Sequence, residues 1–180
     1  AQAANVLSHL EYYLQLVWPE LNVNVVSSTE QWAGAAIAGP KSRDVLQKLF
    51  PDLDVSNQGL PFMGYTEGNL FGVNAKIFRI SFSGELAYEV NVESNNGNFM
   101  WEKIMEIGKE FNIQPYGTEA LSTLRIEMGH VAGSELDGRT IPYDNSLDGL
   151  VSKKKDFIGK RSLSKTAYIA PDRQKVVGVV

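Results

Sequence analysis

Three side chains have types and positions that suit ligand binding: Glu89, Phe82 and Arg125. The stretch RISFSGELAYEV, residues 79–90, alternates apolar and polar residues on both sides of a central Ser-Gly pair, which is typical of a β-hairpin. Glu89 stands late in the second strand, where a carboxylate is unfavourable unless hydrogen-bond donors meet it. Glu89 is therefore either a rim residue whose carboxylate reaches water or an acceptor for a ligand.

Arg125 and Phe82 also have two interpretations each. Arg125 lies one step off the apolar stripe of a predicted helix, so it is an exposed residue, a partner for Glu119 or Glu127, or a binder of carboxylates. Phe82 precedes the Ser-Gly pair and is either a core residue or a platform on which a flat ring stacks.

The sequence lacks the residues and motifs that several kinds of catalytic and metal site require. The chain has no cysteine and only two histidines, His9 and His130, which lie far apart, so a thiolate nucleophile, a disulfide framework and a zinc site are not expected. Neither the G-x-S-x-G pattern of an esterase nucleophile nor a glycine-rich phosphate loop occurs. We predict no metal site.

Composition and charge point to an ordinary globular protein. The net charge of −4 argues against nucleic acid as a partner, because phosphate contacts need a clustered excess of Lys and Arg. No apolar run approaches the roughly 20 residues that span a bilayer, and no signal-peptide pattern is present. We therefore predict a cytoplasmic protein with no membrane contact.

The pattern of elements favours an α+β fold over a doubly wound parallel sheet, because strands and helices segregate along the chain. Helical spacing predicts helices within residues 3–18, 41–50, 97–111 and 117–129, the last with Thr118 as N-cap and Gly129 after its end. Strands are predicted at 22–28, 32–39, 65–73, 75–81 and 85–90. Residues 131–151 read as a long surface loop with a short strand near its end.

The two ends suggest a piece of a longer polypeptide. The chain starts without Met inside a helical pattern, and it stops on QKVVGVV, residues 174–180, which alternates like a strand without a partner. We expect one domain over residues 1–175, truncated at its N-terminus, and the start of a C-terminal β-domain at 176–180.

Five strings occur in one order over nearly the whole chain: WAGAAIAGPKSRDVLQKL, LPFM…LFGV, FRISFSGELAYEV, YGTEALSTLRIEMGH and DGLVSKKKDFIGKRSL. Together they resemble the aminomethyltransferase (T-protein) family of the glycine cleavage system, a folate-binding α+β fold. Residues 6–40 are similar to the α subunits of heterotetrameric sarcosine oxidases, which carry a T-protein-like region.

The resemblance implies roles for the three side chains. The family's Glu that contacts the pterin ring of tetrahydrofolate matches Glu89, and Arg125 matches an Arg of the folate site. Arg125 would either meet the folate tail or orient Glu89. Phe82 stands where many relatives have Tyr, so it can pack on the pterin ring but lacks the hydroxyl. The family's catalytic Asp would lie upstream of this chain; Asp137, Asp144 and Asp148 are loop acids that we expect to be solvated.

The implied function is capture of a one-carbon unit. In an oxidase that demethylates sarcosine, this region would bind tetrahydrofolate, which takes the unit as 5,10-methylenetetrahydrofolate. FAD, FMN and NAD would lie outside this chain, the β, γ and δ subunits would be its partners, and the isolated piece would be inactive. The alternatives are a glycine-cleavage aminomethyltransferase and a module of the same fold that only binds or assembles partners.

Overall fold

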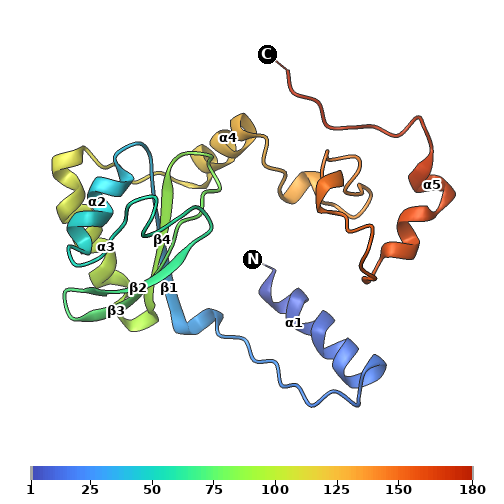
Figure 1. The fold of residues 1–180 in the computed structure, drawn as a ribbon, viewed down its shortest axis with the longest axis horizontal. Coiled ribbons are helices and arrows are strands. Elements are labelled where there is room, and N and C mark those ends of the chain that lie inside the picture. The colour runs from blue at the N-terminus through green and yellow to red at the C-terminus, as the bar shows by residue number, and fades with distance from the viewer. Residues whose placement is uncertain (1, 180) are drawn as a thin grey trace. The chain divides into compact units, whose positions relative to one another are not determined.

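The computed structural model describes residues 2–179, apart from the side chain of Ser134. The chain divides into two compact units between Pro115 and Tyr116, and each is described by itself (Figure 1). The first unit holds α1 (Ala3–Tyr12), β1 (Trp32–Ala38), α2 (Ser42–Leu49), β2 (Tyr65–Leu70), β3 (Val73–Phe78), β4 (Ala87–Glu93) and α3 (Gly97–Gly108). The second holds α4 (Thr118–Met128) and α5 (Thr166–Ile169).

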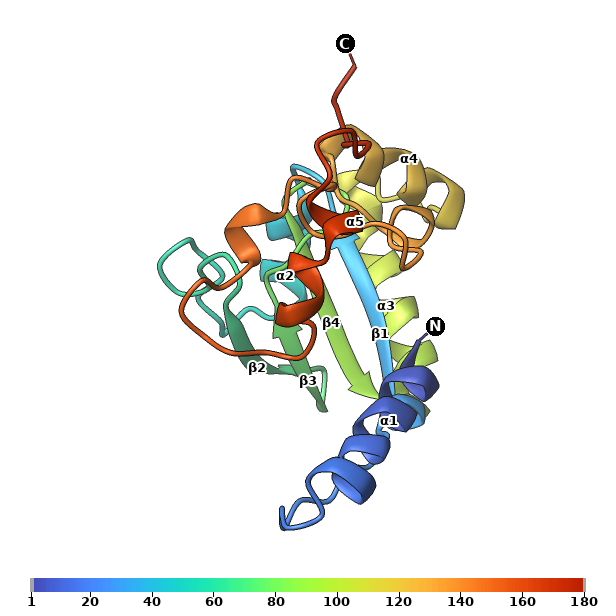
Figure 2. The ribbon, with the colours of Figure 1, turned by 90° about the vertical axis from the view of Figure 1, so that its right-hand side faces the viewer.

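The centre of the first unit is a four-stranded antiparallel sheet in the order β1-β4-β3-β2 (Figure 2). In its register Phe78 faces Glu89 across β3 and β4, and Ala36 faces Glu89 across β1 and β4. Glu89 therefore lies on a central strand with a neighbour on either side. The antiparallel sheet with packed helices confirms the predicted α+β class.

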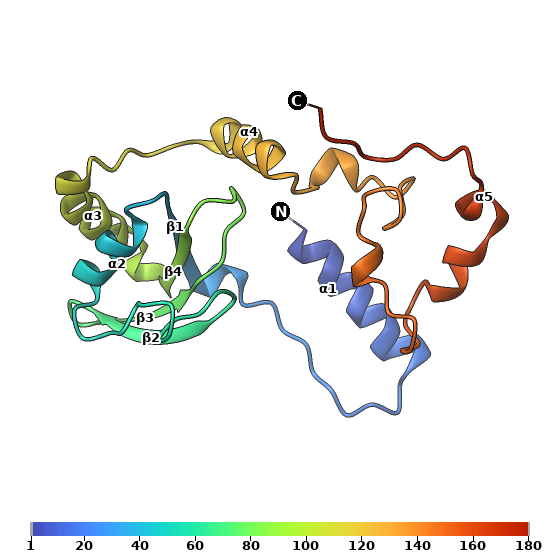
Figure 3. The ribbon, with the colours of Figure 1, turned by 45° about the horizontal axis from the view of Figure 1, so that its top comes forward.

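One face of this sheet is covered by α2 and α3, which lie side by side (Figure 3). Alternate residues of each strand point at these helices, as the two-residue period of a strand requires. The buried core combines strand residues with one face of each helix: Ile37, Ala75, Ile77, Tyr88, Val90, Val92, Val45, Leu46, Leu49, Met100 and Ile104. The intervening strand residues form the other face, which this unit leaves open.

The segment before β1 differs from the sequence prediction. Helix α1 continues as one π-helical turn (Tyr13–Val17), and Pro19 follows its end as predicted. The strand predicted at residues 22–28 is wrong: this segment pairs with no strand among the described residues, and Val26 is 81% exposed. Alternating valines favour a strand only where a neighbouring backbone completes the hydrogen bonds.

The connection between β3 and β4 is wider than the sequence suggested. The two strands do pair, as predicted, but β3 ends at Phe78 and β4 begins at Ala87, so residues 79–86 form an eight-residue loop. Gly84 takes a left-handed φ of 85° in this loop, and its N–H donates to the Ser81 hydroxyl at 2.9 Å. The predicted tight Ser-Gly turn is thus a broad loop with Phe82 in it.

In the second unit, α4 begins one residue earlier than the predicted N-cap implies. Gly117 is the N-cap and Thr118 is the first helical residue, so the prediction of Thr118 as N-cap is wrong. Gly129 ends the helix in a left-handed conformation, φ 80°, as predicted. No residue of α4 is buried, so its apolar stripe gains little from the described residues.

The segment 131–151 is less of a surface loop than predicted, and the described residues show no strand there. Ile141, Asp144 and Asn145 are buried, and short 3₁₀ turns occupy Gly133–Glu135 and Asp148–Leu150. Asp144 is ion-paired with Arg173, whose Nε donates to Oδ1 at 2.9 Å. A partner 29 residues away, which local patterns do not reveal, lets this carboxylate be buried.

Residues 176–180, the predicted start of a β-domain, stay a prediction, and Val180 lies outside the described residues. Within the described part of the chain, no helix combines the length and apolar content needed to cross a bilayer.

Candidate functional site

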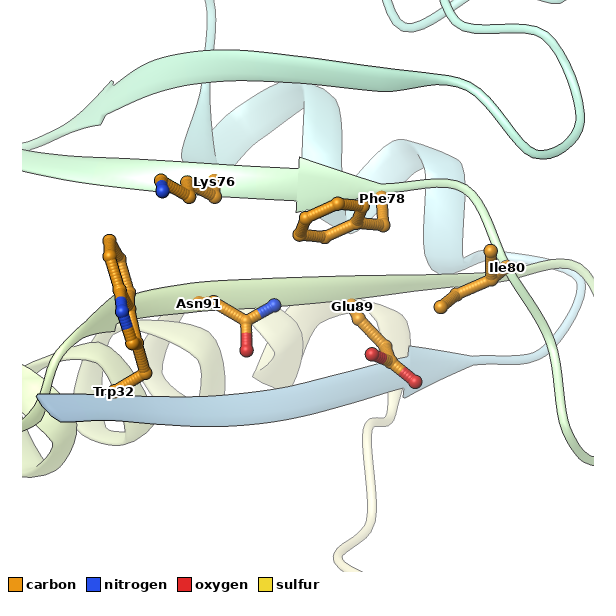
Figure 4. Close-up of a pocket in the computed structure, with 6 residues that line it drawn as sticks. All are labelled: Trp32, Lys76, Phe78, Ile80, Glu89 and Asn91. Carbon is orange, nitrogen blue, oxygen red and sulfur yellow. The ribbon is translucent and has the colours of Figure 1, made fainter. Parts of the chain in front are cut away.

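A pocket of about 360 Å³ lies on the open face of the sheet. It is lined by side chains from three neighbouring strands and the loop that follows β3: Trp32, Lys76, Phe78, Ile80, Glu89 and Asn91 (Figure 4). Pockets that bind small organic molecules usually measure 300 to 1,000 Å³ and combine apolar walls with a few polar groups. This pocket has that character: aromatic and aliphatic walls, one carboxylate, one ammonium group and one amide.

Glu89 lies in the pocket because of the alternation of β4. Its neighbours Tyr88 and Val90 are fully buried against the helices, so the Glu89 side chain must point to the opposite face. The Glu89 carboxylate forms no hydrogen bond or ion pair with any residue that the structure describes. The carboxylate is exposed and keeps all its acceptor capacity for a ligand.

The opposite end of the pocket carries a cation on an aromatic ring. The Lys76 ammonium group lies 4.2 Å from the centre of the Trp32 ring, a cation–π contact. Trp32 is the first residue of β1 and Lys76 lies in the middle of β3, so the two side chains reach toward each other over β4 (Figure 4). This contact holds the positive charge at the pocket wall.

Between these charged groups lie an amide and a ring. Asn91 faces Lys76 on one side and Gly34 on the other. A Cβ at Gly34 would come within 2.6 Å of the Asn91 Oδ1 atom, so the missing side chain makes room for the amide. Phe78 faces Glu89, and its ring centre lies 5.0 Å from that of Tyr65, which extends the aromatic surface onto β2. A hydrogen bond to Glu67 raises the pKa of Tyr65.

Phe82, the second predicted site residue, lies in the broad loop before β4. Its side chain is 44% exposed, so it is not the core residue that one interpretation expected. It is not among the six residues that line the pocket. Stacking of Phe82 on a ligand ring stays a prediction.

Arg125, the third predicted residue, lies on α4 in the second unit. Its guanidinium forms a two-pronged ion pair with Glu135, with N–O distances of 2.6 and 3.3 Å, and also donates to the His130 carbonyl. The side chain is 13% exposed. The partners expected from helical spacing, Glu119 and Glu127, are not the ones observed, and the folate role of Arg125 stays a prediction.

Two of the three loop acids, Asp144 and Asp137, are bonded to arginines. The pKa of Asp144 is lowered to about 2, chiefly by the hydrogen bond from Arg173 and also by one from the backbone N–H of Ile141, against the opposing effect of burial. Asp137 bonds to Arg139, which lowers its pKa as well. A carboxylate held in the ionised form is a poor carrier of a proton near neutral pH. Among residues 2–179, no three His, Asp or Glu side chains cluster closely enough to hold a metal ion.

The sequence reasoning identified Glu89 but missed the other five residues that line the pocket: Trp32, Lys76, Phe78, Ile80 and Asn91. A signal for three of them was present, because Phe78 and Glu89 lie at equal separation from the Ser-Gly pair, and Lys76 and Asn91 lie two residues further out. Trp32 had no such signal, since its pairing with Glu93 joins strands that are far apart in the chain.

Residues 1–155 match the GCVT N-terminal domain family. The chain therefore belongs to this family, which confirms the predicted aminomethyltransferase-type fold. It is 48% identical to the sarcosine oxidase subunit alpha of Rhizobium meliloti (strain 1021), in an alignment of 183 positions that covers the whole chain. It is 48% identical over 180 residues, 99% of the chain, to the same subunit of Corynebacterium sp. (strain P-1).

A more distant relative is the aminomethyltransferase of Halothermothrix orenii, which is 34% identical over 143 residues, 78% of this chain and 39% of that protein. The chain spans about a fifth of the length of the two sarcosine oxidase subunits, 18% and 19%. The similarity to these subunits agrees with the resemblance inferred from the ordered sequence strings.

Proposed function

We propose that this chain is the tetrahydrofolate-binding part of a sarcosine oxidase α subunit. The observation that carries the proposal is the free carboxylate of Glu89 beside an aromatic ring, in a pocket of a chain 48% identical to such subunits. In the parent complex this region would capture the one-carbon unit released from sarcosine. The β, γ and δ subunits and the sites of FAD, FMN and NAD would lie outside the chain.

The residues of the pocket suit one end of the folate molecule. The aminopyrimidinone edge of the pterin presents a ring N–H beside an exocyclic NH₂, and a carboxylate can accept both at once. Glu89 offers two acceptor oxygens without a competing partner in the described chain, and Phe78 offers a ring beside them. Each charge-assisted hydrogen bond contributes about 1.5 to 3 kcal/mol.

When bound, tetrahydrofolate would supply the two nucleophilic nitrogens, N5 and N10, that accept the one-carbon unit. Glu89 would orient the pterin for this step and would keep it from rotating in the pocket. The carboxylate that manages the proton is expected on residues outside this chain, since Asp144 is held as an ion by Arg173. Sarcosine oxidation itself would not depend on Glu89.

The test uses the complete parent complex, as wild type and as Glu89→Gln. The amide places an N–H against the donor edge of the pterin, so we expect the affinity for tetrahydrofolate, measured by titration calorimetry, to fall about tenfold or more. Sarcosine consumption is expected to stay unchanged, while product shifts from 5,10-methylenetetrahydrofolate toward free formaldehyde.

The matched control is Glu93→Gln, because Glu93 lies on the same strand and the same face but does not line the pocket. This variant should bind tetrahydrofolate like the wild type. Equal affinities for wild type and Glu89→Gln would refute the proposed role of the pocket.

The aminomethyltransferase relative supports a second candidate, transfer of an aminomethyl-derived carbon to tetrahydrofolate in glycine cleavage. The identity of 34% against 48% favours the oxidase. Assaying the parent protein with sarcosine and with an aminomethylated carrier separates the two. A parent protein that fails to bind folate at all would instead support the binding or assembly module.

A further inference from the structure

The pocket has charges of opposite sign at its two ends, and the structure leaves them apart. Glu89 and Lys76 lie on adjacent strands but form no ion pair with each other, and neither has an oppositely charged partner among the described residues. Among the described residues, the Lys76 ammonium group contacts the face of Trp32, which also lines the pocket. Both charges therefore remain available to one ligand that carries donors at one end and an anionic group at the other.

The order of the residues along the strands sets the direction of such a ligand. Glu89 and Phe78 form one cross-strand row, Asn91 and Lys76 the next, and Trp32 faces Glu93 in the row beyond. Successive rows on one face of a sheet lie about 7 Å apart, so the pocket extends for about 14 Å from the first row to the third. The Phe78 ring and the Asn91 amide line the pocket between the Lys76 ammonium group and the Glu89 carboxylate (Figure 4).

Lys76 is held at its end of the pocket by its surroundings. Its neighbours Ala75 and Ile77 are buried in the core, which fixes the strand and directs the Lys76 side chain outward. The Trp32 ring supports the ammonium group at 4.2 Å without neutralising its charge. An anion that approached this point would gain a charge-assisted hydrogen bond from an amine already close to its bound position.

We propose that Lys76, backed by Trp32, binds the carboxylate-bearing tail of the ligand whose ring end is held by Glu89. This inference rests on the proposed function, because tetrahydrofolate has this layout: a donor edge on the pterin, a flat aromatic middle and a glutamyl tail with carboxylates. The ligand would lie along β3 and β4, with Phe78 beside its ring end and Asn91 beside Lys76, nearer its tail. Lys76 would thereby distinguish folates from simple pterins.

The experiment is titration calorimetry on the complete parent complex with two probes. One probe is tetrahydrofolate, and the other is 6-methyltetrahydropterin, which keeps the donor edge but has no carboxylate. For Lys76→Met we expect about a fivefold to tenfold loss of affinity for tetrahydrofolate and no change for the pterin. Lys76→Arg keeps the charge and should bind tetrahydrofolate within about twofold of wild type.

The control is Lys103→Met, since Lys103 also lies over an aromatic ring, 5.4 Å from the centre of Phe71, but does not line the pocket. This variant should match the wild type with both probes. Unchanged tetrahydrofolate affinity in Lys76→Met would overturn the role of Lys76 while leaving the proposed function intact. Equal losses with both probes would also overturn it, because they would indicate a disturbed pocket.

Failure of the proposed function would give a different result from failure of the inference about Lys76. If wild type binds neither probe, folate binding by this pocket is refuted, and the inference about Lys76 falls with it. If Glu89→Gln weakens both probes while Lys76→Met weakens tetrahydrofolate alone, the orientation of the ligand along the strands is established.

Discussion

Glu89 illustrates how a single residue gains a role from its neighbours. The carboxylate is exposed because Tyr88 and Val90 are fully buried, and it keeps its acceptors because it forms no ion pair or hydrogen bond with the described residues. Asp144 has the reverse arrangement: a buried carboxylate whose charge is matched by Arg173. The first arrangement suits binding of a donor-bearing ligand, and the second suits stability.

For Asp144 we predict a pH-dependent contribution to stability. The pKa is lowered from 3.8 to about 2 in the folded chain, so the contribution is fully present above about pH 4 and is lost as the pH falls toward 2. Asp144→Asn should lower the hydrogen-exchange protection of the Val176 amide, which donates to the Asp144 carbonyl, by about tenfold at pH 6.

The difference between Asp144→Asn and wild type should shrink as the pH is lowered from 4 to 2, with protection factors corrected for the intrinsic exchange rate. Asp137→Asn is the control, since the Asp137 carboxylate accepts hydrogen bonds from Arg139 and Thr140, which are near it in the described chain. A protection difference that does not vary with pH would contradict this account of Asp144.

At the scale of elements, the open sheet face depends on a small residue in β1. Gly34 leaves the space that the Asn91 amide occupies, because a Cβ there would lie 2.6 Å from Oδ1. The amide is the end of a flexible side chain, so an added methyl group would displace it rather than distort the sheet. The displaced amide would then enter the pocket.

We therefore predict that Gly34→Ala weakens tetrahydrofolate binding several-fold while changing the free energy of unfolding by less than about 1 kcal/mol. The double variant Gly34→Ala/Asn91→Ala should bind like Asn91→Ala alone, because the clash has been removed. Calorimetric affinities of the three variants in the parent complex give this comparison. An equal loss from Gly34→Ala in both backgrounds would exclude the proposed steric cause.

An element or a site residue could be predicted where the residues that pair with it lie close to it in the sequence, and was missed where its partners are distant. The Ser83-Gly84 pair sits midway between Phe78 and Glu89, so local alternation was enough for the pairing of β3 with β4. The strand predicted at residues 22–28 failed because nothing local shows whether a partner exists. The burial of Asp144 was missed for the same reason, and Lys76 became a site residue only through the three-dimensional register.

At the scale of the whole molecule, the two units differ in the kind of interaction that stabilises each of them internally. Every member of the main core cluster lies between Ile37 and Ile104, within the first unit. The second unit buries few side chains among those described, and it relies on polar links such as Arg125–Glu135 and Arg173–Asp144. The binding pocket stands on the unit with the larger apolar core.

We predict that residues 29–115 fold without the remainder, with a cooperative thermal transition by circular dichroism. Leu46→Ala removes a fully buried side chain and should cost about 2 to 5 kcal/mol, whereas Phe62→Ala, at a position that is 68% exposed, should cost less than about 0.5 kcal/mol. A broad transition without cooperativity, or similar effects from the two substitutions, would show that this core is not sufficient.

The strict alternation of buried and exposed residues in β4 also specifies the register in which this strand pairs with its neighbours. If β4 slipped by one residue against its neighbours, Glu89 would enter the apolar layer under α2 and α3, while the Tyr88 ring would move out into water. Burying an unpaired carboxylate is far more costly than burying a neutral side chain. The residue proposed to recognise the ligand therefore also penalises every odd-numbered misalignment of the sheet, so that a chain able to complete its core has already formed its binding surface.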